Sequence, residues 1–356
     1  MSLRKLNSML MIAAIALAAV SCKDDEEEVE VVYVNGSLRF ELPEFILPNE
    51  TVTIVPKGLS HPDGGEIGYC WKVTPSMKTY DTTRFENGLD AAGEPTEGIF
   101  IHSFPDSLKT YTVYCYGFAS GYASSSYNLK TTVVSPGPEK SITNTGIKFF
   151  DPNVEIDGIR HYYTTIGGKD WLRQDLAYTE KGVPFRNGKA MNGVFGLYYS
   201  YEEALEACPE GWTLPTDEDW TNLGKALNGN TGSDNPYSTI PGVAAKLMAD
   251  AYFNGIRMWE YWPSVGKITN ESKMSMIPSG YALLGEQDSN GNYAQARFKG
   301  VYEYSVYWTA DKVADEEGMA YYRYIYCDQP DMMIGKGDTK TFGAAVRCVR
   351  DSVNNN

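Results

Sequence analysis

The stretch CPEGWTLPTDEDW, from Cys208 to Trp220, places one cysteine, two prolines, two tryptophans and four carboxylates within thirteen positions. Two interpretations of this stretch are open. A thiol beside several acids is typical of a reactive loop, whereas the same residues between two helices would form a structural corner. The surrounding sequence has to decide between these interpretations, because the choice also decides whether the protein is an enzyme.

The sequence on both sides of this stretch predicts helices. Upstream, SYEEALEAC has a capping-box pattern, with Ser200 as the N-cap and Glu203 three residues later, and Pro209 ends the helix. Downstream, a second helix begins at Thr216, and Asp217, Glu218 and Asp219 in its first turn are favoured by the helix dipole. Trp220, Leu223 and Leu227 then form one apolar stripe. We therefore expect a structural corner, with both tryptophans in a core.

The histidine count argues against a catalytic cysteine. A nucleophilic thiol needs a base within hydrogen-bonding reach, and histidine usually serves as this base. The sequence holds three histidines, His61, His102 and His161, and none follows His161. Metalloprotease, P-loop and serine-elbow motifs are absent from the sequence. We expect no catalytic residue, no metal site and no cofactor.

The N-terminus has the pattern of a lipoprotein signal. Basic Arg4 and Lys5 precede the apolar run MLMIAAIALAAV, which is typical of a secretory signal over residues 1–21. The following AVSC resembles a bacterial lipobox and would place the lipid on Cys22, although an ordinary signal peptide is the alternative. The acidic segment KDDEEEVE completes a tether over residues 22–30 and resembles the export signal of Bacteroidetes surface lipoproteins. This resemblance implies a lipid-anchored protein on the outer face of the outer membrane.

The composition restricts the partners of the chain. Its formal net charge is −15, so the chain would repel the phosphates of nucleic acid. We expect no nucleic-acid partner, and we expect membrane contact through the N-terminal lipid alone.

Residues 31–134 predict an all-β first domain. Alternating segments such as TVTIVP, GYCWKV and YTVYCYGFA are separated by turn clusters, which indicates an antiparallel sandwich. Two of these segments resemble the central strands of an immunoglobulin-like domain and carry Cys70 and Cys115. In such a domain the two cysteines would lie on neighbouring strands. They would then either form a disulfide or remain as two buried thiols. Residues 135–145 are rich in Pro, Gly and Ser and predict a linker.

The corner belongs to a longer pattern that runs through the second half of the chain. DGIRHYYTTIGGKDWLRQDL, GLYYSYEEALEACPEGWTLPTDEDW, YWTAD and a final AAVRCVRD together resemble the Fibrobacter succinogenes major paralogous domain. The resemblance covers residues 146 to about 351 and is most specific at the corner and at VRCV, and we place the domain at residues 146–352. The segment from 230 to 300 departs from the family pattern. More distantly, the domain is similar to C-type lectin-like domains, which implies an α+β fold.

The lectin-like resemblance implies one disulfide and one binding surface. It pairs Cys208 with Cys348 and places recognition in the long loop over residues 252–300. The formylglycine-generating enzymes share the corner motif but use a pair of cysteines, and Cys327 alone is spare here. The candidate ligand-binding residues are Trp259, Tyr261, Trp262, Asp288, Asn290 and Asn292. The alternative is that these aromatic residues pin the loop to the core while the polar residues form its turn.

These observations predict a multi-domain surface lipoprotein, with an immunoglobulin-like β-sandwich followed by a C-type lectin-like α+β domain. We expect the second domain to bind an extracellular glycan or protein. Two other functions stay open, namely a structural or tip subunit of a surface appendage and a carboxylate-based enzyme.

Overall fold

The computed structural model describes residues 31–75, 78–81, 98–105, 109–134, 146–156, 159–177, 181–253, 256–260, 263–289, 291–293 and 295–352. The predicted signal peptide, Cys22 and the acidic tether lie outside these residues, as do the predicted linker and the candidates Tyr261, Trp262 and Asn290. In the described part of the chain, no helix combines the length and apolar character that crossing a membrane requires.

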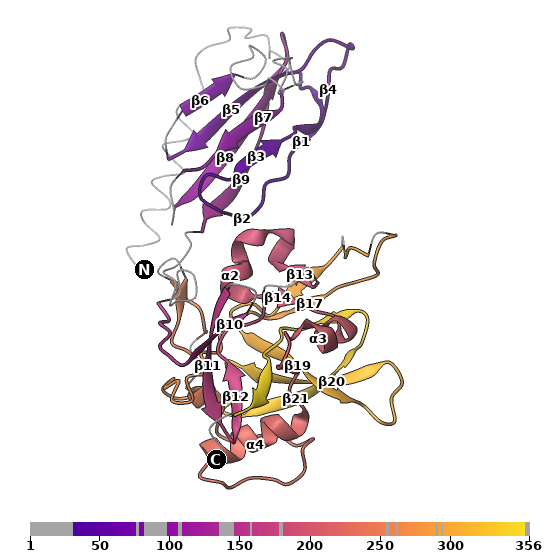
Figure 1. Ribbon diagram of the computed structural model, residues 1–356. Coiled ribbons are helices and arrows are strands. Elements are labelled where there is room, and N and C mark those ends of the chain that lie inside the picture. The colour runs from indigo at the N-terminus through magenta and orange to yellow at the C-terminus, as the bar shows by residue number, and fades with distance from the viewer. Residues whose placement is uncertain are drawn as a thin grey trace, which may run out of the picture.

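The described residues of the first half of the chain, within 31–134, form strands and the loops between them (Figure 1). Its five-stranded sheet has the order β2-β9-β8-β5-β6, and two further pairs are β1-β4 and β3-β7. The bounds are β1 (Asn35–Arg39), β2 (Phe45–Ile46), β3 (Thr51–Ile54), β4 (Lys57–Ser60), β5 (Gly68–Thr74), β6 (Lys78–Asp81), β7 (Phe100–Ser103), β8 (Thr110–Phe118) and β9 (Ser125–Val133). Strands occur at all of the segments that the alternating pattern predicts.

Alternation along these strands separates an inner from an outer face. In β8, every second side chain from Tyr111 to Gly117 is buried, and in β3, Val52 and Ile54 are buried between exposed threonines. The inner faces share one core, in which the rings of Trp71 and Phe100 stack with centroids 5.2 Å apart. The period of two that predicts strands therefore also fills this core.

The predicted bridge between Cys70 and Cys115 is wrong, because both remain thiols; Cys115 is buried, as the alternative states, whereas Cys70 is half-buried. The register of β5 and β8 pairs Cys70 with Tyr116 and Trp71 with Cys115. Residues directly opposite each other share a face of the sheet, and successive residues point to opposite faces. Cys115 therefore points into the core with Trp71, while Cys70 points away from it.

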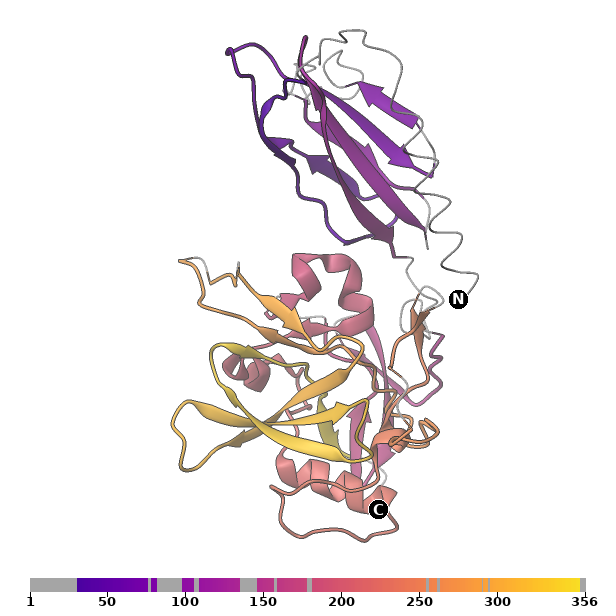
Figure 2. The same cartoon turned by 180° about the vertical axis from the view of Figure 1, so that it is seen from behind.

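The second half contains most of the helices and several small sheets (Figures 1 and 2). A four-stranded sheet has the order β10-β11-β12-β23, and two three-stranded sheets have the orders β19-β20-β21 and β18-β17-β22. The bounds are β10 (Asn153–Ile156), β11 (Ile159–Ile166), β12 (Lys169–Leu172), β17 (Tyr281–Leu283), β18 (Arg297–Lys299), β19 (Tyr304–Lys312), β20 (Met319–Tyr326), β21 (Met332–Asp338), β22 (Phe342–Gly343) and β23 (Val349–Asp351).

Two short strand pairs and several short helices complete this half. The pairs are β13 (Val183–Pro184) with β14 (Leu197–Tyr198), and β15 (Tyr252–Phe253) with β16 (Ile256–Arg257). The helices are η2 (Phe185–Asn187), η3 (Lys189–Met191), α2 (Asn192–Phe195), α3 (Tyr201–Ala207), α4 (Asp217–Leu227) and α5 (Ala244–Leu247). The described chain is therefore mainly β with few helices, which is the coarser part of the predicted fold class.

Helices α3 and α4 begin where the sequence predicts, and both start with a capping box. At α3, the Ser200 hydroxyl accepts from the Glu203 amide while the Glu203 carboxylate accepts from the Ser200 amide at 2.8 Å. At α4, Thr216 and Asp219 make the same reciprocal bonds. These bonds satisfy backbone donors that the first helical turn leaves without partners.

Candidate functional site

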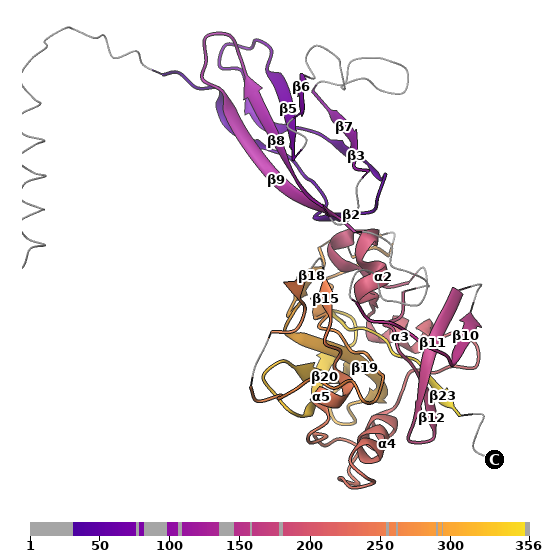
Figure 3. The ribbon, with the colours of Figure 1, turned by 90° about the vertical axis from the view of Figure 1, so that its left-hand side faces the viewer.

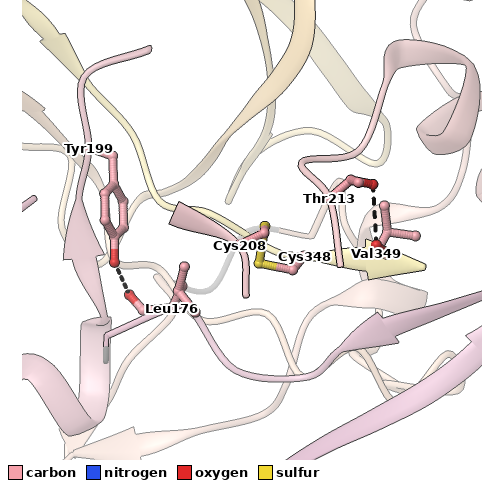
Figure 4. Close-up of a disulfide and its surroundings, with 6 residues drawn as sticks. All are labelled: Leu176, Tyr199, Cys208, Thr213, Cys348 and Val349. Carbon is pink, nitrogen blue, oxygen red and sulfur yellow. Dashed lines mark hydrogen bonds between the residues drawn. A yellow bond between two sulfur atoms is a disulfide. The ribbon is translucent and has the colours of Figure 1, made fainter. Parts of the chain in front are cut away.

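The Cys208–Cys348 disulfide closes the second half of the chain, as the lectin-like resemblance implies (Figure 4). The two Cα atoms lie 5.7 Å apart and are separated by 140 residues in the sequence. Thr213 and Val349 exchange backbone hydrogen bonds of 2.8 Å next to this bridge, so the corner is also paired with the final strand. In the chain-entropy model a loop of this length gives roughly 5 kcal/mol of stabilisation. Because the sulfur of Cys208 forms the disulfide, it is not a free thiol. The interpretation of this stretch as a loop with a reactive thiol is therefore wrong.

The two tryptophans of the corner are core residues, as predicted. Trp220 is fully buried and its ring lies 4.6 Å from that of Trp171. Trp212 is 6% exposed and is covered by the guanidinium of Arg350, which lies 4.5 Å from the ring centroid. Neither ring presents an open face to a ligand.

The carboxylate of Asp217 is used inside the fold. It accepts hydrogen bonds from Arg323 Nε at 2.6 Å and from Thr309 Oγ1 at 2.9 Å, and both charged side chains are 0% exposed. Burial raises the pKa of Asp217, while the charge of Arg323 acts in the opposite direction. The predicted structural role of this acid is therefore observed, although its partner on β20 was not predicted.

A second buried ion pair joins Asp175 to Arg347, the residue before Cys348. Arg347 Nε donates to Asp175 at 2.5 Å, and its Nη1 donates to the Met274 carbonyl at 2.7 Å. Both side chains are at most 1% exposed. Because a buried charge needs a partner, this pair fixes the segment before β23 against the interior.

Cys327, the spare cysteine, lies in the core rather than in a reactive pocket. It is 1% exposed, and burial raises the pKa of its thiol to about 11, with further contributions from the carboxylates of Glu260, Glu303 and Asp328. A thiol nucleophile requires the thiolate form, which these surroundings oppose.

Three of the predicted ligand-binding residues lie in the described part of the chain, and the structure does not gather them into one site. Trp259 is 2% exposed and its Nε1 donates to the Met276 carbonyl at 3.3 Å, so its assignment to a binding surface is wrong. Trp259 instead pins the long loop to the core, which was the alternative interpretation. Asp288 and Asn292 are exposed and bind each other, since the Asp288 carboxylate accepts from the Asn292 amide at 2.9 Å.

A cleft of about 470 Å³ opens beside these turn residues, and we call it the α3 cleft. Its walls are the N-terminal turn of α3, the loop that follows β17 and the turn between β21 and β22. The lining residues are mostly polar: Ser200, Glu202, Glu203, Gly285, Glu286, Gln287, Tyr293, Thr339, Lys340 and Thr341. The predicted long loop therefore supplies one wall of the cleft, through residues other than the predicted ones, and the other two walls come from outside this loop.

Tyr293 supplies the aromatic side chain of the α3 cleft. The residue is 9% exposed and lines the cleft together with Ser200 and Gln287. Burial is the main cause of its raised pKa, and the carboxylates of Glu203 and Glu202 raise the pKa further. The phenol therefore stays protonated and remains a hydrogen-bond donor. The sequence offered only the high tyrosine content of the chain as a signal for this residue.

The opposite wall of the cleft is held by Asp338. Its Oδ1 accepts from the Lys340 amide at 3.0 Å and from the Thr341 amide and hydroxyl at 2.9 Å. Burial opposes ionisation of Asp338, but these hydrogen bonds prevail and lower its pKa. The turn that carries Lys340 and Thr341 is thereby fixed before any ligand arrives.

A second hollow of about 590 Å³ adjoins the α3 cleft, and we call it the β17 groove. It is lined by Leu283, Gly285, Gln295, Arg297 and Thr341, and it shares Gly285 and Thr341 with the cleft. In Figures 1 and 2, α3, β17 and the β19–β21 sheet lie on the same side of the second half. The two hollows adjoin each other at Gly285 and Thr341.

A β-rich domain closed by a disulfide, with a corner between two capped helices, is the class that this fold and site define. Residues 164–350 match the model of the Fibrobacter succinogenes major domain, and the chain belongs to this family. No curated protein matches the chain.

Proposed function

We propose that this chain is a lipoprotein of the outer membrane, lipidated on Cys22 and facing the cell exterior. In this proposal the first half is an immunoglobulin-like spacer and the second half is a C-type lectin-like recognition domain. The signal-like N-terminus supports the anchor. The sheets packed on a shared core support the spacer, and the Cys208–Cys348 bridge supports the lectin-like fold.

The proposed activity of the second half is binding of an extracellular glycan in the α3 cleft. The observation that carries this proposal is an open hollow whose wall combines the largely buried ring of Tyr293 with amide, carboxylate and hydroxyl groups. Binding sites for small ligands combine an apolar or aromatic surface with a few fixed polar groups that set orientation. Gln287 and Glu286 are exposed at the mouth of this hollow and would bond sugar hydroxyls.

A glycan array probed with the purified protein tests this proposal. We expect a restricted set of glycans to bind, and we expect the paired change Glu286→Gln and Gln287→Ala to weaken binding at least about tenfold, because one hydrogen bond is lost and a charge-assisted one becomes neutral. Both residues are exposed, so folding should be preserved. The control is Glu210→Gln, an exposed acid of the corner. An array without bound glycan, or equal binding by the paired variant, would contradict the proposal.

A carboxylate-based enzyme is the second candidate, because Glu202 and Glu286 line the same cleft. Glycoside hydrolases use two carboxylic groups that face each other across the bound sugar. Release of new reducing ends from the bound glycans, abolished by Glu286→Gln, would support this candidate. A protein that binds no glycan and instead copurifies with other surface proteins would favour the appendage role.

A further inference from the structure

Six aromatic side chains lie half-buried along the β19–β20 pair and the adjoining strands β17 and β22. We call them the aromatic strip, and they are Tyr281, Tyr304, Tyr322, Tyr324, Tyr326 and Phe342. The register pairs Tyr304 with Tyr326, and the pleat of β20 places its three tyrosines of the strip on one face. The strip therefore follows one face of the β19-β20-β21 sheet and continues onto the β18-β17-β22 sheet, where Tyr281 contacts Tyr304 and Phe342 contacts Tyr322.

The rings of the strip hold one another in place. Phe342 stacks on Tyr281 with centroids 5.4 Å apart and on Tyr322 at 4.8 Å, and Tyr304 stacks on Tyr326 at 4.6 Å. Tyr322 also lies directly over Gly335, where an added Cβ would come within 2.3 Å of the ring. Rigid rings lose little conformational entropy when a ligand binds, so this surface is preorganised.

The phenol groups of the strip also gather. Burial raises the pKa of Tyr322 to about 12, and the neighbouring phenols of Tyr324, Tyr281 and Tyr304 add to this rise. The Tyr322 hydroxyl therefore remains protonated at physiological pH and can donate a hydrogen bond. A purely apolar partner would bury such a donor without a hydrogen-bond acceptor, and this would cost binding free energy.

Two cations flank the strip on β18. Lys299 lies opposite Tyr281 and Arg297 lies opposite Leu283, so all four share one face of this small sheet. Both cations are exposed, and within the described ranges neither forms a salt bridge. In a chain with a net charge of −15, two adjacent exposed cations without acidic partners are an unusual local surplus of positive charge.

We propose that this surface binds a linear acidic polysaccharide, with carboxylates of successive sugars on Arg297 and Lys299 and with sugar hydroxyls along the aromatic strip. This inference rests on the proposed glycan-binding function and names its ligand class. Arginine and lysine bind carboxylates through charge-assisted hydrogen bonds, which are stronger than neutral ones. The strip joins the β17 groove at Leu283 and Arg297, and the groove joins the α3 cleft. A chain of several sugars would therefore contact all three.

The charge of the polymer provides the test. Polygalacturonic acid and its fully methyl-esterified form share one backbone and differ in charge, so binding of each to the purified protein is measured at low salt. We expect the acid form to bind at least about tenfold more tightly, and the preference to fall as salt screens the ion pairs. The double change Arg297→Gln and Lys299→Gln should remove the preference.

Two further variants separate the effect of Arg297 and Lys299 from a general effect of net charge, and the effect of the tyrosine hydroxyls from that of the rings. Lys148→Gln with Lys267→Gln changes the net charge equally at exposed positions away from the strip and should keep the preference. Tyr322→Phe with Tyr324→Phe keeps the rings, removes two hydroxyls and should weaken binding several-fold. Equal binding of both polymers, or an unchanged preference in the Arg297/Lys299 variant, would overturn the acidic-ligand inference. If neutral glycans still bind on the array, the proposed function survives this failure; if no glycan binds, the proposed function fails as well.

Discussion

Asp217 links four parts of the second half through one carboxylate. Its backbone begins α4, its oxygens bind Thr309 of β19 and Arg323 of β20, and Arg323 also donates to the Ser238 carbonyl at 2.7 Å. The sequence predicts an acid in this first helical turn because of the helix dipole. It does not reveal the partner, because Arg323 lies 106 residues further along the chain. Pairings at such separation depend on the fold and carry no local signal.

We expect Asp217→Asn to destabilise the protein by about 3 kcal/mol, because it leaves the Arg323 guanidinium buried without a counter-charge. The asparagine keeps the size of the side chain and an acceptor for Thr309, so the lost charge dominates the effect. Urea unfolding measures the change, and hydrogen exchange should also rise over residues 233–239, which Arg323 holds through carbonyl contacts.

Asp234→Asn serves as the matched control, because Asp234 pairs with Lys225 at the surface and is 99% exposed. Exposed ion pairs contribute little to stability, so this variant should unfold like the wild type. Equal stability of the two variants would contradict a structural role for the buried pair.

At the scale of elements, the sequence predicts features that depend on neighbouring residues better than features that depend on contacts between distant segments. Period-two alternation identified the strands of the first half, and capping residues identified the starts of α3 and α4. Near the C-terminus, the segment FGAAVRCVRD divides into β22 and β23, and no pattern in the sequence indicates β21. The β21 sequence MMIGKGD has two glycines and little alternation, and Tyr322 fills the space above Gly335. The sequence also gives no sign of the α3 cleft, because its three walls come from separate segments that meet only after folding.

The tyrosines around the β19–β20 pair predict how the free energy of unfolding changes at alkaline pH. Burial raises the pKa of both Tyr322 and Tyr201 to about 12, from an ordinary value of 10.0. Above pH 10 the unfolded chain therefore binds fewer protons than the folded chain at these groups. The free energy of unfolding should fall as pH rises from about 10 to 12, and this part of the stability is fully present below pH 10.

Tyrosinate absorbance followed against pH measures this effect, with the urea-unfolded protein as the reference. We expect a late component in the folded protein that appears together with the loss of near-ultraviolet circular dichroism. Tyr322→Phe should reduce that component. A folded protein that titrates at the same midpoint as the unfolded chain would show that these phenols are open to solvent.

At the scale of the whole molecule, the two halves meet through the loop that carries β2 (Figure 3). Phe45 packs against Phe185 and Phe253 of the second half, with ring centroids 6.1 Å and 5.9 Å away. Glu44 forms an ion pair with Arg186, which adopts a positive φ of 51°. A second residue of this loop therefore contacts the second half.

We therefore expect Phe45→Ala to weaken the coupling between the halves by on the order of 1 kcal/mol, because full burial of a phenylalanine contributes about 1.5–3 kcal/mol and this ring is half-buried. The expected result is a calorimetric unfolding transition that broadens or separates into two, with a wider distribution of distances in solution scattering. Phe150→Ala is the matched control, because Phe150 is 69% exposed and removing its ring leaves the contact intact. If both variants behave like the wild type, the linker alone connects the halves and the ligand surface moves freely relative to the anchor. If Phe45→Ala alone separates the transitions, the first half sets the direction in which the α3 cleft faces.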